Sequence, residues 1–242
     1  MLIKKNMKMA DVVLLNHMLI PVIHRFGINL GFGDKTVEEI CQEGQIDLNF
    51  FLELVNAYHD SDYFPNEKLQ TIPAKDIVAY LKMTHANYLN EWLTEIESKI
   101  DKLRSEKDED QKYISLIKNF FEGYRSELTE HILREEELVF PYVIALEQTV
   151  LTQTVSDSNR KLLNSYSIQT FHDEHDDIEE KLLDLKTIMI KYLNPPVNIL
   201  LYHKIIQELF KLEEDLNYHS RIENNVLIPK VKTMEKLAKN LL

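Results

Sequence analysis

The sequence predicts an all-α protein in which a small helical N-terminal domain precedes a four-helix bundle with up-down-up-down topology. Two observations predict this fold class. The chain of 242 residues contains only five glycines and seven prolines, whereas a sheet would need frequent turns. Its later part contains four apolar-periodic stretches of more than twenty residues, each long enough to form a bundle helix.

Short helices are predicted in the N-terminal domain. Their expected positions are about 10–25, 36–44 and 47–59. Thr36 and Asp47 are typical N-caps of the second and third of these helices. The turn Gly27–Lys35 holds three of the five glycines, so its backbone is expected to adopt conformations that other residues avoid.

Residues 60–75 concentrate Asp, Asn and Pro without helical periodicity. Such a composition indicates a linker or a docking segment between two units. We therefore expect a small helical domain over residues 1–65 and a bundle domain over residues 75–242.

The four bundle helices are expected at about 75–105, 111–148, 160–193 and 196–240. Three breakers separate them. These are the charged run 106–110, the polar stretch 152–159 and Asn194-Pro195-Pro196. Short connections between long helices make sequential neighbours antiparallel.

Charge and cysteine content restrict the functional class. A formal net charge of −12 disfavours nucleic acid or an anionic membrane surface as a partner. The sequence contains no run of about 18 uncharged apolar residues, which is the pattern that would predict a membrane span. The single cysteine, Cys41, excludes an intramolecular disulfide and Cys-rich metal ligation, and it fits a reducing cytoplasm.

An internal repeat carries the chemistry of the predicted site. His131 precedes Glu135 by four residues, and His219 precedes Glu223 by the same spacing; apolar residues and a proline follow both in register. Positions four apart lie one turn apart on the same helix face, so each repeat presents an imidazole beside a carboxylate. One such pair is common by chance on a solvated helix. Two pairs in register indicate metal ligands.

Histidines on the first and third bundle helices are expected at the same height. In an antiparallel hairpin, residues at equal height are equidistant from the turn. Pairing His85 with the first repeat gives a midpoint near residue 109, and pairing that repeat with His175 gives one near 154. Pairing His175 with the second repeat gives a midpoint near 198. All three fall at or beside a predicted breaker. His172 lies one turn before His175, and height does not decide between them.

The predicted ligand set is His85, His131, Glu135, His175, His219 and Glu223. Four imidazoles and two carboxylates suit two metal ions. The set fits two non-haem irons that share carboxylate and oxo bridges and keep positions open for a small ligand. Zinc and manganese stay open as alternatives. Tyr88, Trp92 and Tyr218 neighbour these positions as gating, electron-accepting or plain core residues.

With these residues placed, the chain resembles the hemerythrin-like (HHE cation-binding) proteins of the repair-of-iron-centres type, also called regulators of cell morphogenesis and NO signalling. The segments His131–Pro141, Glu174–Asp176 and His219–Pro229 are similar to the family's HxxxEE…FP, EHD and HxxxENN…P elements. The EHD element favours His175 over His172. The resemblance covers nearly the whole chain.

The N-terminal segment Arg25–Cys41 is similar to the family's short N-terminal domain, which usually carries two adjacent cysteines. Leu30, Gly31 and Phe32 occupy that stretch here, and Cys41 lies several residues later. A role that relies on paired thiols is therefore not expected of this chain.

The resemblance implies a cytoplasmic di-iron protein that helps to restore iron–sulfur clusters damaged by nitric oxide or peroxide, through iron delivery or NO reduction. The implied partners are a small gas, O2 or NO, and damaged iron–sulfur proteins. The spacing identifies no reaction, so whether the chain is an enzyme stays open, as does a homodimer. The alternatives are an O2- or NO-responsive sensor or binding module, and iron or oxygen storage.

Overall fold

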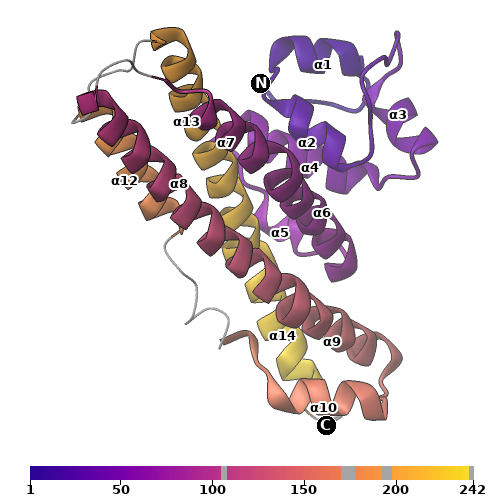
Figure 1. Cartoon of the computed structure of the whole chain (residues 1–242). Coiled ribbons are helices and arrows are strands. Elements are labelled where there is room, and N and C mark those ends of the chain that lie inside the picture. The colour runs from indigo at the N-terminus through magenta and orange to yellow at the C-terminus, as the bar shows by residue number, and fades with distance from the viewer. Residues whose placement is uncertain (105–107, 170–177, 192–197, 240–242) are drawn as a thin grey trace.

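The computed structural model describes residues 1–104, 108–169, 178–191 and 198–239 (Figure 1). Within these ranges all regular elements are helices, and a single isolated β-bridge joins Lys8 to Thr36. The predicted all-α class is confirmed there, and long helices packed side by side are consistent with a helical bundle. No helix in these ranges is long and apolar enough to cross a bilayer.

The N-terminal helices are short. They are α1 (Met9–Leu15), α2 (Leu19–Arg25), α3 (Val37–Glu43), α4 (Leu48–His59) and α5 (Asn66–Leu69). Thr36 and Glu39 form a reciprocal capping box at the start of α3, and Asp47 caps α4 by accepting from the backbone N–H of Phe50 at 2.7 Å. Both predicted N-caps are thus confirmed. Gly27, Gly31 and Gly33 have φ values of 77°, 107° and 60°, which confirms the predicted glycine-dependent turn.

The single helix predicted over 10–25 is wrong, because the chain forms α1 and α2 instead. Asn16 adopts an extended backbone conformation, and its side-chain oxygen accepts from the N–H of Met18 at 3.1 Å. This local side-chain bond competes with the helical hydrogen-bond pattern and ends α1.

Three of the long helices are interrupted by one π-helical turn each. The first consists of α6 (Ala74–Asn87), η1 (Tyr88–Trp92) and α7 (Leu93–Asp101). The second consists of α8 (Asp108–Arg134), η2 (Glu135–Val139) and α9 (Phe140–Thr152). The last consists of α13 (Ile199–Ile222), η3 (Glu223–Leu227) and α14 (Ile228–Ala238). Helices α8 and α13 run alongside α12 (Ile178–Lys191) in Figure 1.

The prediction of a continuous third bundle helix over 160–193 is also wrong. Helix α10 (Asp157–Ser165) ends where Tyr166 turns extended, with φ −137° and ψ 155°. The ring of Tyr166 packs edge-on against Tyr142, and Glu235 of α14 accepts from the backbone N–H of Ile168 at 2.8 Å. Tertiary contacts therefore override helix periodicity here. The predicted breaker at 194–196 lies outside the described residues.

The apolar core consists of two clusters that meet at a polar layer. One cluster joins the N-terminal helices to α6, α9 and α14, and the other joins α7, α8, α12 and α13. The change occurs between Leu81 of α6 and Tyr88 of η1 in the first long helix, and between Leu216 and Ile222 along α13. Side chains of residues 1–59 thus share a core with bundle helices, and the division into two domains stays a prediction.

Candidate metal centre

The three π-turns lie at the level where the two apolar clusters meet. Glu135 is the first residue of η2, Glu223 is the first residue of η3, and His85 lies three residues before η1. A π-turn inserts an extra residue into the helix and is often found at functional sites. Local helix geometry therefore marks the same level from three separate helices.

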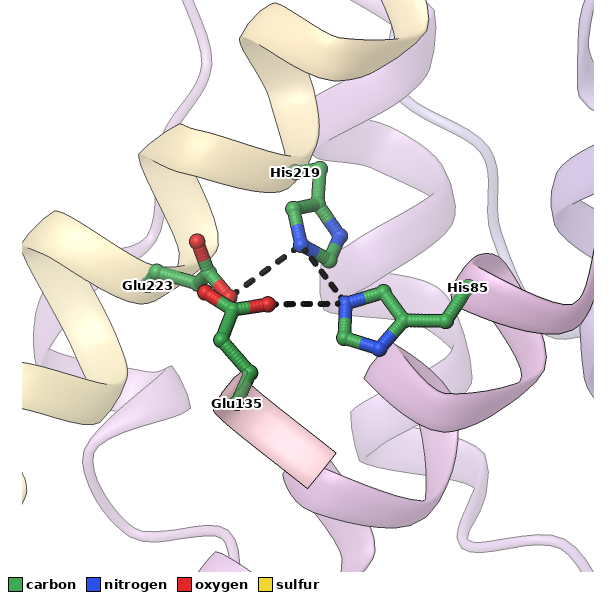
Figure 2. A group of neighbouring side chains, drawn as sticks. All are labelled: His85, Glu135, His219 and Glu223. Atoms are coloured by element: carbon green, nitrogen blue, oxygen red, sulfur yellow. Dashed lines mark hydrogen bonds and ion pairs between the residues drawn. The ribbon is translucent and has the colours of Figure 1, made fainter. Parts of the chain in front are cut away.

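Four buried side chains converge at this level, as Figure 2 shows. They are His85, Glu135, His219 and Glu223, and one nitrogen or oxygen of each lies within 4.8 Å of those of the others. The Nε2 atoms of His85 and His219 lie 3.2 Å apart. Nε2 of His85 lies 3.1 Å from Oε2 of Glu135, and Nε2 of His219 lies 3.1 Å from Oε1 of Glu223. Two imidazoles and two carboxylates thus point at one small volume.

The hydrogen bonding of this group is incomplete. Glu135 is fully buried, yet neither of its carboxylate oxygens accepts a hydrogen bond from a described residue. Nδ1 of His219 is also buried and has no hydrogen-bond partner in the described ranges. A buried carboxylate is costly unless hydrogen bonds or a cation compensate it. Imidazole nitrogens and carboxylate oxygens are ligands for iron, zinc and manganese, so the donor set fits a transition-metal ion.

His131 lies beside the group. Its Nε2 atom is 3.2 Å from Oε1 of Glu135, and its side chain is 8% exposed. The structure therefore brings four of the six predicted ligands together and places His131 next to them. His175 and its alternative His172 lie outside the described residues. The role of all six as ligands stays a prediction.

Glu136 orients His85, and sequence reasoning missed it. Oε1 of Glu136 lies 3.1 Å from Nδ1 of His85, which leaves Nε2 facing the other ligand candidates. Burial acts to lower the pKa of His85, but its close contacts with Glu135 and Glu136 and the negative charges of Glu135 and Glu223 outweigh burial and raise the pKa to about 9. Phe140 stacks on the imidazole with ring centroids 5.4 Å apart. Glu136 is the second glutamate of the HxxxEE pattern, so the sequence did contain a signal that could have identified it.

A contact from the predicted linker holds the π-turn that carries Glu223. Nε2 of Gln70 donates to the backbone carbonyl of Val226 at 2.9 Å, and the backbone carbonyl of Gln70 accepts from Nζ of Lys230 at 2.7 Å. A π-turn displaces carbonyls from the regular helical pattern, and Gln70 supplies a donor to one of them. The segment 60–75 therefore packs on the π-turn that begins at Glu223.

These features define a class: a helical protein with a buried histidine and glutamate group that could hold a metal ion. The chain is similar over most of its length to proteins named "Iron-sulfur cluster repair protein". ScdA of Staphylococcus haemolyticus is 20% identical over 210 residues, which cover 86% of this chain and 90% of that protein. ScdA of Staphylococcus epidermidis is 21% identical over 232 residues (95% and 100%). YtfE of Cronobacter sakazakii is 24% identical over 219 residues (86% and 89%). No family model matches the chain.

Proposed function

We propose that this chain is a cytoplasmic hemerythrin-like protein that holds two irons in a four-helix bundle, residues 75–242, behind a small N-terminal domain, residues 1–65. We propose further that it assists the repair of iron–sulfur clusters damaged by nitrosative or oxidative stress. The observation that carries the metal site is the fully buried Glu135 carboxylate, which faces imidazole nitrogens and accepts no hydrogen bond within the described ranges.

The ligands would be His85, Glu135, His219 and Glu223, joined by His131 and by His175. A pair of non-haem irons supplies redox-active Lewis-acid positions for a small ligand such as O2 or NO. Two carboxylates placed between imidazoles from separate helices suit a bridging role.

The surrounding residues prepare the ligands. Glu136 would hold a proton on Nδ1 of His85, which leaves Nε2, the nitrogen that faces the other candidates, to bind a metal ion in place of a second proton. The rings of Phe140 and Tyr88 are 1% and 0% exposed, and they pack against His85 and His219 respectively. These apolar faces exclude bulk water from the ligand atoms.

The repair role is supported by the names of the relatives. Proteins named "Iron-sulfur cluster repair protein" align with 86–95% of this chain and with 89–100% of their own length. A damaged iron–sulfur protein would then be the partner, and either iron delivery or NO chemistry would be the contribution of this chain.

Recovery of a nitric-oxide-damaged iron–sulfur enzyme tests this proposal. Extracts that contain the wild-type chain should restore enzyme activity faster than extracts without it. The double variant Glu135→Gln, Glu223→Gln should behave like the empty extract, whereas Glu137→Gln, an exposed neighbour, should behave like wild type. Equal recovery with and without the wild-type chain would refute the repair role.

An O2- or NO-responsive binding module is the second candidate. It is favoured by the packing of the N-terminal helices on α6 and of Gln70 on η3, because a change at the ligands would reach both contacts. Ligand-dependent protease sensitivity of residues 60–75, without any effect on cluster recovery, would separate it from the repair role.

A further inference from the structure

A second buried polar cluster lies beside the candidate metal centre, and its cation comes from the N-terminal segment. The side chain of Arg25, at the end of α2, has no solvent-exposed surface. Its Nη2 donates to Oδ2 of Asp215 at 2.6 Å, and its Nε donates to Oδ1 of Asn87 at 3.3 Å. Its Nη1 donates to the hydroxyls of Tyr80 and Tyr58 at 3.3 and 3.5 Å.

The partners of Arg25 stand next to the ligand candidates in sequence and in space. Asn87 follows His85 by two residues, and Asp215 precedes His219 by one helical turn on α13. Arg25 therefore contacts both helices that present an imidazole to the metal group.

Tyr88 closes the connection between these helices. Its hydroxyl donates to the same Oδ2 atom of Asp215 at 2.5 Å, and its ring meets the ring of His219 edge-on at 5.8 Å. The guanidinium carbon of Arg25 lies 5.7 Å from the centroid of the Tyr88 ring. The Asp215 carboxylate thus binds both Arg25 of the N-terminal segment and Tyr88, the first residue of η1.

The chemistry of arginine makes this contact directional. A guanidinium is planar and presents its donors in a fixed fork, so its partners are held at set angles, which a lysine ammonium would not impose. Because the charges of Arg25 and Asp215 are both buried, each is costly without the other, and the geometry is strongly enforced.

We propose that Arg25 is a positioning residue of the metal centre. It acts through Asp215 and Asn87 to fix the spacing of the helices that carry His85 and His219, so the N-terminal segment is an integral part of the site. This inference rests on the proposed metal binding. It predicts that the affinity for iron and the geometry of the ligands depend on Arg25, although this side chain would contact neither the iron nor the ligand side chains.

The test replaces the ion pair as a pair. The double variant Arg25→Leu, Asp215→Leu removes both buried charges together, so it should stay folded and lose less stability than a variant that removes Asp215 alone. Its Fe(II) affinity, measured anaerobically by chelator competition, should fall at least tenfold, and the visible spectrum of the Co(II)-loaded protein should change. The exposed pair Lys5 and Glu38, 2.9 Å apart, replaced in the same way, is the control. A folded double variant with unchanged affinity and spectrum overturns the proposal.

A measurement on the wild-type chain tests the same coupling without a variant and decides alone if the double variant does not fold. Coupling between two sites is reciprocal, so Fe(II) loading should slow amide hydrogen exchange in α2 (Leu19–Arg25). Unchanged exchange there would overturn the proposal. Absence of Fe(II) binding by wild type would instead refute the proposed function, so the two failures are distinguishable.

Discussion

Helix α13 passes through two buried polar clusters one turn apart, and the two differ in how their charges are compensated. At Asp215, protein groups complete the cluster, because Oδ2 accepts from Arg25 and Tyr88 and the two opposite charges cancel. At His219 and Glu223, the neighbouring Glu135 is equally buried but accepts no hydrogen bond within the described ranges. The first cluster needs nothing further, whereas the second has the composition of a site that a cation would complete.

This difference indicates that the Asp215 cluster is complete without a ligand, whereas the cluster at Glu135 has the properties of a binding site. A paired, hydrogen-bonded charge fixes geometry, and breaking it leaves a buried charge alone. A buried carboxylate that accepts no hydrogen bond, such as that of Glu135 in the described ranges, costs stability in the metal-free chain, and metal binding recovers that cost. Removing a charge from the metal-free chain should therefore cost much more stability in the first cluster than in the second.

The largest expected effect is at Asp215. Asp215→Asn leaves the guanidinium of Arg25 buried without its counter-charge, so the free energy of unfolding should fall by about 3–5 kcal/mol. Urea denaturation of the metal-free protein measures it. Glu214→Gln removes the neighbouring exposed carboxylate and should change stability by less than about 0.5 kcal/mol. Equal losses in the two variants would break the distinction between the clusters.

The second effect is stabilisation by metal. At a free Fe(II) concentration of about one hundred times the dissociation constant, wild type should gain about 2.7 kcal/mol of stability for each iron bound, or roughly 5–10 °C in Tm per iron for a chain of this size. Anaerobic thermal denaturation measures the shift. Glu135→Gln should lose the shift while its metal-free stability falls by less than about 2 kcal/mol, because His85 can become neutral when that carboxylate is removed. A metal-free Glu135→Gln protein as unstable as Asp215→Asn would contradict this account of the second cluster.

The third effect concerns the residue that orients His85. Glu136→Gln weakens the hydrogen bond to Nδ1, so metal affinity should fall by about 10–100-fold, the usual cost of losing such a partner. Chelator competition measures the affinity. Glu137→Gln, the adjacent exposed glutamate, should keep wild-type affinity. A loss of equal size in both variants would indicate a general effect of charge in place of orientation.

The smallest effect is expected at Cys41. Burial, assisted by the negative charge of Asp47, raises the pKa of its thiol from 9.0 to about 12. The folded state therefore retains this proton, so stability is unaffected below pH 9 and decreases as the pH rises from about 9 towards 12. Iodoacetamide at pH 8 should label Cys41 only after denaturation, and Cys41→Ser should retain its iron. Native labelling at the denatured rate would contradict this.

The ligand candidates illustrate what a sequence can predict. The two HxxxE repeats and the turn positions placed His85 at the level of Glu135 and Glu223, because helix period and hairpin register determine height. The structure brings these side chains together, and their metal binding stays a prediction. The N-caps Thr36 and Asp47 were confirmed, because a cap depends on residues three apart.

The remaining features depend on contacts that local patterns do not encode. Each π-turn adds one residue to its helix, and hydrophobic periodicity over a long segment did not reveal so local a change. Arg25 contacts residues 62 and 190 positions away in the chain. The break at Tyr166 depends on Glu235 and Tyr142. Each of these is a tertiary interaction that overrides or escapes local propensity.

Iron stoichiometry tests the central claim most directly. Anaerobically purified wild-type chain, loaded with Fe(II) and separated from excess metal, should contain about two irons per chain by elemental analysis. The double variant Glu135→Gln, Glu223→Gln should contain almost none, and Glu137→Gln should match wild type. Little iron in wild type, or equal iron in the double variant, would contradict the claim that the buried glutamates hold a metal centre.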